Sequence, residues 1–243
     1  MSRNSLSRKR TYFFYNPVRY GLVIPLLLIT LLPTTDTLAQ LVPPPNVRPS
    51  RPSRLNVQFH RAETAWKSGS SLLEAKARID RVLIERPKDV EARKLRAGIY
   101  MSMGAPEKAL LDAREAVRLN PLDGEAQLLV CEAAIRSGEV DAALVGLNLS
   151  ADLLLEQSTF HVRLSRCAID LNEYDAAEAY ARTALAGNAR SAEANLQLAR
   201  VFLITDEQEK AVTVLKRAID AHILSTSVIR RDTTFSSVLG ELQ

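Results

Sequence analysis

An alanine recurs at a fixed interval of 34 residues along most of this chain, as Ala75, Ala109, Ala143, Ala177 and Ala211. The residue seven positions after each alanine is small or apolar, and these residues are Val82, Ala116, Ser150, Ala184 and Ala218. Self-similarity at a constant spacing of this length indicates one supersecondary unit repeated in tandem. The chain therefore divides into five units without an insertion, at 56–89, 90–123, 124–157, 158–191 and 192–225.

The second unit shows that each unit contains two helices. Its first half carries Leu95, Ile99 and Met103 at i, i+4 and i+8, which is one face of a helix. Gly104 ends this helix, and Pro106 suits the first turn of a second one. The recurring alanines then fall where the two helices cross, because small side chains allow two helix backbones to approach closely.

The units resemble tetratricopeptide repeats, whose pattern of small, aromatic, glycine, alanine and proline positions is clearest in the second unit. The residues that carry it there are Ala97, Tyr100, Gly104, Ala109, Ala116 and Pro121. The other four units keep part of this pattern in register, so the resemblance covers residues 56–225. It implies an all-α fold, a right-handed superhelical solenoid of five helical hairpins.

Residues 226–243 are expected to cap the C-terminal end, because the last hairpin of a solenoid leaves an apolar face uncovered. Phe235, Val238, Leu239 and Leu242 follow the i, i+3, i+4, i+7 spacing of an amphipathic α-helix. The segment is therefore predicted to form a short capping helix.

Residues 1–39 are expected to form a signal peptide. A basic beginning is followed by an apolar run at 21–32 and by the small-residue ending of Thr37-Leu38-Ala39. That run is shorter than the roughly 20 apolar residues of a membrane-spanning helix. Membrane contact is therefore expected only transiently, during export, although an uncleaved N-terminal anchor remains an alternative. Residues 40–55 are rich in proline and are expected to form an extended tether.

The formal net charge of +4 belongs to the N-terminus alone. Residues 1–39 contain five bases and one acid, so the remainder of the chain is neutral. A neutral repeat region lacks the basic surface that binding to a phosphate backbone requires. No nucleic-acid partner is expected.

No catalytic or metal-binding motif is present in the sequence. The histidines His60, His161 and His222 are isolated from one another, whereas a metal site needs three or four converging ligands. We expect no enzymatic activity, no cofactor and no metal. Cys131 and Cys167 are expected to be buried free thiols that face different neighbours, although a disulfide stays possible in an oxidising compartment.

The resemblance also implies a binding groove, because the first helices of tetratricopeptide repeats line a concave face. The positions carried over to this chain are Lys94, Met101, Leu128, Ile135, Arg136, Val162, Arg166, Ile169, Leu196, Arg200 and Leu203. Gly98 and Glu132 stand where some members carry asparagines that clamp a C-terminal carboxylate, so such a clamp is not expected. The mixture of apolar and charged positions favours an amphipathic helix or an apolar segment as ligand.

The sequence thus predicts an exported scaffold of the bacterial cell envelope that binds a protein or peptide partner in its groove. The alternative is a structural or assembly subunit that self-associates, as a homo-oligomer, or joins a larger envelope complex. The apolar band of the groove would in that case be covered by a second copy, by the terminal helix or by the tether.

Overall fold

The computed structural model describes residues 53–242 of the chain. The predicted signal peptide and residues 40–52 of the predicted tether lie outside the described residues. Within 53–242 the secondary structure is entirely helical, with eleven α-helices, one 3-10 helix and no strand, which confirms the all-α prediction. No helix in this part of the chain combines the length and the apolarity that a membrane span requires.

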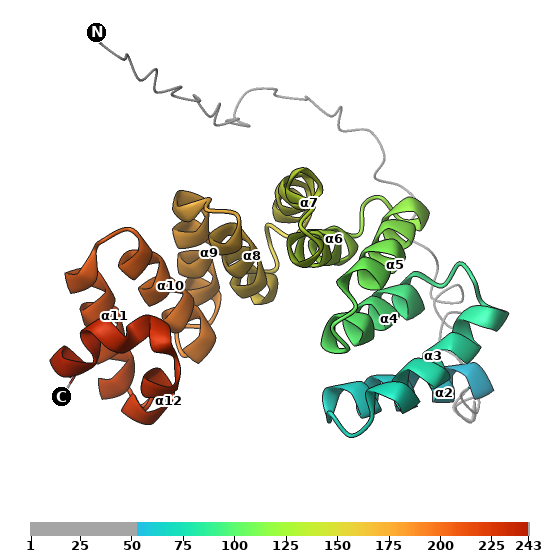
Figure 1. Ribbon diagram of the computed structural model, residues 1–243, viewed down its shortest axis with the longest axis horizontal. Helices are drawn as coiled ribbons and strands as arrows, with labels where there is room; N and C mark the ends of the chain where they lie inside the picture. The colour runs from blue at the N-terminus through green and yellow to red at the C-terminus, as the bar shows by residue number, and fades with distance from the viewer. Residues whose placement is uncertain (1–52, 243) are drawn as a thin grey trace, which may run out of the picture. The chain divides into compact units, whose positions relative to one another are not determined.

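Ten of these helices form five consecutive hairpins, which follow one another from blue to red in Figure 1. The hairpins are α2 (Arg54–Lys67) with α3 (Leu72–Glu85), α4 (Val90–Ser102) with α5 (Pro106–Leu119), α6 (Gly124–Ser137) with α7 (Val140–Leu153), α8 (Ser158–Asp170) with α9 (Tyr174–Gly187), and α10 (Ala192–Ile204) with α11 (Gln208–Asp220). We call α2, α4, α6, α8 and α10 the A helices.

Capping residues fix where several A helices begin. The side chains of Ser53, Asp89, Asp123 and Ser191 each accept a hydrogen bond from the backbone N–H three residues later, which satisfies a donor that the helix cannot pair. Because Ser53 caps α2, this helix already includes Arg54 and Leu55. The prediction that the tether extends to residue 55 is therefore wrong by two residues.

The alanines spaced 34 residues apart are completely buried in all five hairpins. The closeness of the helix approach is clearest at Gly146 in α7. A Cβ atom there would lie only 2.9 Å from the backbone nitrogen of Cys131 in α6 and 3.0 Å from the carbonyl oxygen of Gln127. The small residues of the repeat pattern are thus required because larger side chains would push the paired helices apart.

The core extends along the stack as three clusters of buried apolar side chains. One lies at α2, α3 and α4, a central one runs from α4 to α10, and one joins α9 to the C-terminal segment. Each cluster draws side chains from more than one hairpin. The stability of a hairpin therefore depends on its neighbours, as in other repeat proteins.

The C-terminal segment covers the last hairpin, but not as the predicted amphipathic α-helix. Residues 226–242 form a short helix α12 (Thr226–Arg231) and a 3-10 helix η1 (Thr233–Leu242). Residues three apart lie on one face of a 3-10 helix, so Phe235 and Val238 are both fully buried against the C-terminal cluster. Leu242 is also buried, whereas Leu239 is only partly buried.

Candidate functional site

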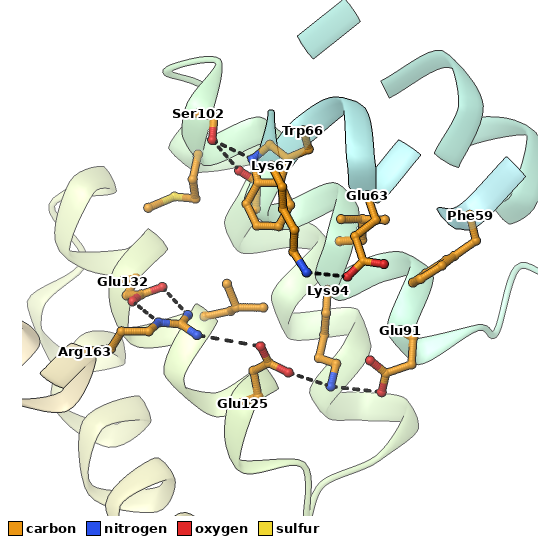
Figure 2. Close-up of a pocket in the computed structure, with 14 residues that line it drawn as sticks. Phe59, Glu63, Trp66, Lys67, Glu91, Lys94, Ser102, Glu125, Glu132 and Arg163 are labelled. Atoms are coloured by element: carbon orange, nitrogen blue, oxygen red, sulfur yellow. Dashed lines mark hydrogen bonds and ion pairs between the residues drawn. The ribbon is translucent and has the colours of Figure 1, made fainter. Parts of the chain in front are cut away.

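A cavity of about 490 Å³ lies on the A helices of the first four hairpins (Figure 2). We call it the A-helix cavity, and every residue that lines it comes from α2, α4, α6 or α8. The lining residues are Phe59, Glu63, Trp66, Lys67, Glu91, Lys94, Leu95, Gly98, Met101, Ser102, Glu125, Leu129, Glu132 and Arg163. Its walls therefore combine apolar side chains with seven charged ones.

The indole of Trp66 forms one wall of the cavity by lying against Gly98 of the neighbouring A helix. A Cβ atom at Gly98 would come within 2.7 Å of two ring carbons, so the ring occupies the space that any other residue would fill. The indole Nε1 donates a hydrogen bond of 2.8 Å to Ser102 Oγ, which in turn donates to the carbonyl oxygen of Gly98 at 3.1 Å. Figure 2 shows this arrangement, which fixes the plane of the ring.

Lys94 of α4 lies at the centre of the charged lining and joins two A helices. Its Nζ is 2.9 Å from Glu91, 2.9 Å from Asp123 and 3.0 Å from Glu125. Burial disfavours its charge, but the hydrogen bonds to these three carboxylates outweigh that effect and raise the pKa of Lys94. The ammonium group of Lys94 is therefore charged, and it is paired with all three carboxylates.

Arg163 of α8 extends the same network to a third helix. Its Nη2 lies 2.7 Å from Glu132, and its Nη1 lies 3.7 Å from Glu125 (Figure 2). Burial again opposes the charge, and the hydrogen bonds to Glu132 raise the pKa of Arg163. On the other side of the cavity, a 2.7 Å hydrogen bond from Lys67 lowers the pKa of Glu63.

Two of the residues predicted to line the groove, Lys94 and Met101, line the A-helix cavity. The prediction is wrong for Leu128, which is completely buried in the central core cluster. Its neighbour Leu129 lines the cavity instead. Successive residues of an α-helix point about 100° apart, so an error of one position exchanges a core residue for a lining residue.

The other predicted apolar positions lie on A helices and are partly buried. Ile135 and Ile169 pack against the central cluster, and Leu196 and Leu203 pack against the C-terminal cluster. Val162 is also partly buried. These five side chains do not belong to the lining of the A-helix cavity.

The predicted arginines are held by different partners along the stack. Arg136 donates to the carbonyl oxygen of Met101 at 3.1 Å. Arg166 pairs with Glu193 at 2.6 Å, which links α8 to α10. Arg200 donates to Asp232 at 2.6 Å and thereby attaches the C-terminal segment to α10.

The groove residues predicted from the resemblance start in the second unit, so they leave out the contribution of α2 to the cavity. Phe59, Glu63, Trp66 and Lys67 all come from this helix. One sequence signal could have identified Trp66 as a lining residue. It lies nine residues before Ala75, just as Tyr100 lies nine residues before Ala109. No local signal shows that its ring would reach Gly98.

The two cysteines do not face different neighbours. Both are buried free thiols in the central cluster, Cys131 from α6 and Cys167 from α8. The neighbouring Cys131, together with burial, raises the pKa of the Cys167 thiol. Across residues 53–242, no group of three or more His, Cys, Asp or Glu side chains is arranged to hold a metal ion.

Known structures with the same arrangement of hairpins are repeat proteins of low sequence identity. The crystal structure of TTC0263, a thermophilic TPR protein in Thermus thermophilus, is 20% identical over 76% of this chain and 99% of its own, with a TM-score of 0.63. PilW, a widely conserved type IV pilus biogenesis factor, is 19% identical over 73% of this chain and 82% of its own, also with a TM-score of 0.63. YrrB, described as a TPR protein with an unusual peptide-binding site, is 18% identical over 67% and 84% with a TM-score of 0.50.

At sequence identities of 18–20%, the similarity to these three structures shows a shared fold alone. No curated protein sequence is significantly similar to the chain. The tetratricopeptide repeat family, however, matches residues 99–153 and 163–225. This match, the buried alanines at 34-residue intervals and the five hairpins agree with one another. Within the described residues the chain therefore carries tetratricopeptide repeats, matched over 99–153 and 163–225, and it has the fold of TPR proteins.

Proposed function

We propose that this protein is a binding scaffold that holds a segment of a partner protein in the A-helix cavity. The observation that carries the proposal is the lining itself, in which apolar side chains from three helices are combined with charged side chains from four, held in fixed positions. Ligand sites on proteins commonly have this composition, with a few polar groups that set the orientation of the ligand. YrrB, a protein of the same fold, is described as having a peptide-binding site.

A site-specific photo-crosslinker tests this function in cells that express the full chain. A photoreactive amino acid at Met101, which lines the cavity, should capture a partner protein that can be identified by mass spectrometry. The matched control is the same amino acid at Leu111 of α5, which is 68% exposed and lies outside the cavity. Capture from Leu111 but not from Met101 would place the binding surface elsewhere and contradict the proposal.

We also propose that the scaffold works in the bacterial cell envelope after export through residues 1–39. The support is the order of basic, apolar and small residues in that segment. PilW, which has the same fold, is described as a pilus biogenesis factor. Cell fractionation should find the full chain in the envelope and the chain that begins at Gln40 in the cytoplasm. Export of the shortened chain would contradict the assignment.

A second candidate function is an assembly subunit that associates with a second copy of itself. Val145 and Leu149 favour it, because they lie one turn apart on α7 and are 58% and 43% exposed. Sedimentation at increasing concentration should then show a dimer that the Val145→Lys variant loses. A chain that remains monomeric at every concentration would exclude this function.

A further inference from the structure

We propose that the partner segment bound in the A-helix cavity is basic and apolar, with a Lys or Arg side chain next to a bulky apolar one. This inference rests on the proposed binding function and specifies its ligand. It is argued from the balance of charge in the lining, from the exposure of particular carboxylates and from the aromatic wall.

The lining contains more carboxylates than cations. Glu63, Glu91, Glu125 and Glu132 face Lys67, Lys94 and Arg163, and Asp123 adds a fifth carboxylate through its contact with Lys94. Each cation already has a carboxylate within 3.0 Å. An acidic ligand would therefore have to displace an existing ion pair, whereas a basic ligand meets uncompensated negative charge.

The negative charge is accessible mainly at Glu91. Its side chain is 65% exposed, although it contacts Lys94 at 2.9 Å. Lys94 retains Asp123 and Glu125 as partners at 2.9 and 3.0 Å. Glu91 can consequently turn toward a ligand cation without leaving Lys94 unpaired.

The aromatic wall suits the same ligand. Trp66 and Phe59 line the cavity together with Leu95, Met101 and Leu129. The face of an indole ring attracts cations, and the stems of Lys and Arg pack against apolar surfaces while their charged ends remain near carboxylates. A cationic side chain beside a bulky apolar one would use both parts of the lining.

Trp66 also provides the measurement, because it is the only tryptophan in the protein. Random peptides of about a dozen residues, displayed on phage, are selected on the full chain, and the enriched sequences are synthesised with blocked termini. Binding is then followed by the emission of Trp66. We expect the selected peptides to be enriched in Lys and Arg over Asp and Glu. Replacing their basic residues with Gln should weaken binding about tenfold.

Charge-neutral variants of the protein test the carboxylates directly. Glu91→Gln and Glu63→Gln should each weaken binding of the basic peptide about two- to fivefold, as expected for partly exposed ion pairs. The matched control is Glu107→Gln, since Glu107 is the second residue of α5 as Glu91 is the second residue of α4, and Glu107 is outside the cavity. Thermal unfolding of all three variants establishes that they are folded.

The outcomes separate the ligand class from the binding function. Selected peptides that are acidic or uncharged, or binding that is unaffected by Glu91→Gln and Glu63→Gln, would overturn the basic ligand but leave the scaffold function in place. A selection that yields no peptide able to change Trp66 emission would also overturn the basic ligand. Capture of a partner from Met101 decides the scaffold function independently.

Discussion

Gly98 is the one glycine in the lining of the A-helix cavity, and a single added methyl group there would meet the ring of Trp66. Its missing Cβ leaves the space that the Trp66 ring fills, and the ring is held there by the hydrogen bond to Ser102. By the resemblance to tetratricopeptide repeats, the glycine also stands at a position where a carboxylate clamp would carry asparagine. An asparagine there would collide with the indole, so the aromatic wall and such a clamp exclude each other.

Gly98→Ala should displace the indole of Trp66. The added methyl group would lie 2.7 Å from two ring carbons, so the ring must move and the hydrogen bond to Ser102 should be lost. Tryptophan emission should shift to longer wavelength as the ring becomes more exposed to water. Gly240→Ala is the control, because no atom lies within 4 Å of a Cβ built there. An unchanged emission spectrum in Gly98→Ala would contradict the packing described.

All five hairpin turns contain a residue in the left-handed region, beginning with Gly69 at φ of 64°, and in the last four hairpins these residues recur at intervals of 34. Gly104 and Gly138 have φ of 71° and 77°, and Asn172 and Asp206 both have φ of 61°. Glycine adopts this conformation without strain, and Asn and Asp tolerate it better than other residues do. Each of these turns therefore keeps a residue type that tolerates a positive φ, although the residue itself changes from Gly to Asn or Asp.

Asp206→Ala should consequently be less stable than Asp206→Gly, by about 1 kcal/mol in the free energy of unfolding. Alanine has a Cβ that collides with the backbone at φ of 61°, whereas glycine has none. Urea denaturation of the two variants provides the measurement. Ala179, which is exposed in the interior of helix α9, allows a control, because glycine has no advantage at a helical φ and Ala179→Gly should be destabilising. Equal stability of the two Asp206 variants would show that this turn relaxes.

At the scale of the helices, the recurring alanines set the distance between the two members of a hairpin. Ala177 of α9 is completely buried, whereas Ala179 on the same helix is exposed. Ala177→Leu should lower the free energy of unfolding by about 1–3 kcal/mol, because the larger side chain overpacks the crossing. Ala179→Leu should be nearly neutral. Equal effects of the two substitutions in thermal unfolding would show that Ala177 is not at a crossing.

The attachment of the C-terminal segment to α10 through Asp232 should depend on pH. Partial burial acts in the opposite direction, but hydrogen bonds from Thr234 and Arg200 lower the pKa of Asp232 below its ordinary value. A lowered pKa means that ionised Asp232 stabilises the folded state. This stabilisation is complete above about pH 4, the pKa of an unfolded aspartate, and it is lost as the pH falls through the lower folded pKa.

The protein should therefore become less stable in acid, and Asp232→Asn should reduce that dependence. Denaturation of both proteins between about pH 2 and pH 6 measures the difference, since the range includes the ordinary aspartate pKa. The variant should be less stable than the natural protein near the upper end of this range and should approach it in stability near the lower end. A constant difference across this range would mean that Asp232 does not stabilise the folded state through its charge.

At the scale of the whole molecule, the described hairpins form a linear array in which each one depends on its neighbours. The C-terminal cluster is completed by Phe235 and Val238 of η1, while Trp66 lies in the first hairpin. A defect at one end of such an array is expected to act first on the adjacent hairpins.

Phe235→Ala should therefore remove about 3–5 kcal/mol locally, as is typical for a buried phenylalanine. Hydrogen exchange should accelerate in α10 and α11 at denaturant concentrations that leave the emission of Trp66 unchanged. Ser236→Ala is the control, because Ser236 is exposed on the same segment. Simultaneous loss of protection and of native Trp66 emission would show that the array unfolds as one cooperative unit instead.

The sequence by itself determined the repeated hairpins and the burial of the alanines. Both follow from local features, namely the helix period, the turn residues and a spacing that repeats along the chain. The tertiary structure alone decided which A-helix side chains remain accessible. Leu128 and Leu129 differ by one position, yet only Leu129 lines the cavity.

The charged lining was equally beyond local prediction, because its ion pairs join residues that are far apart in sequence. Lys94 reaches Glu125 across 31 residues, and Trp66 reaches Ser102 across 36. Such contacts depend on how each helix is rotated and placed against the next. That placement results from packing of the whole stack, whereas the residues within each helix specify only its own faces.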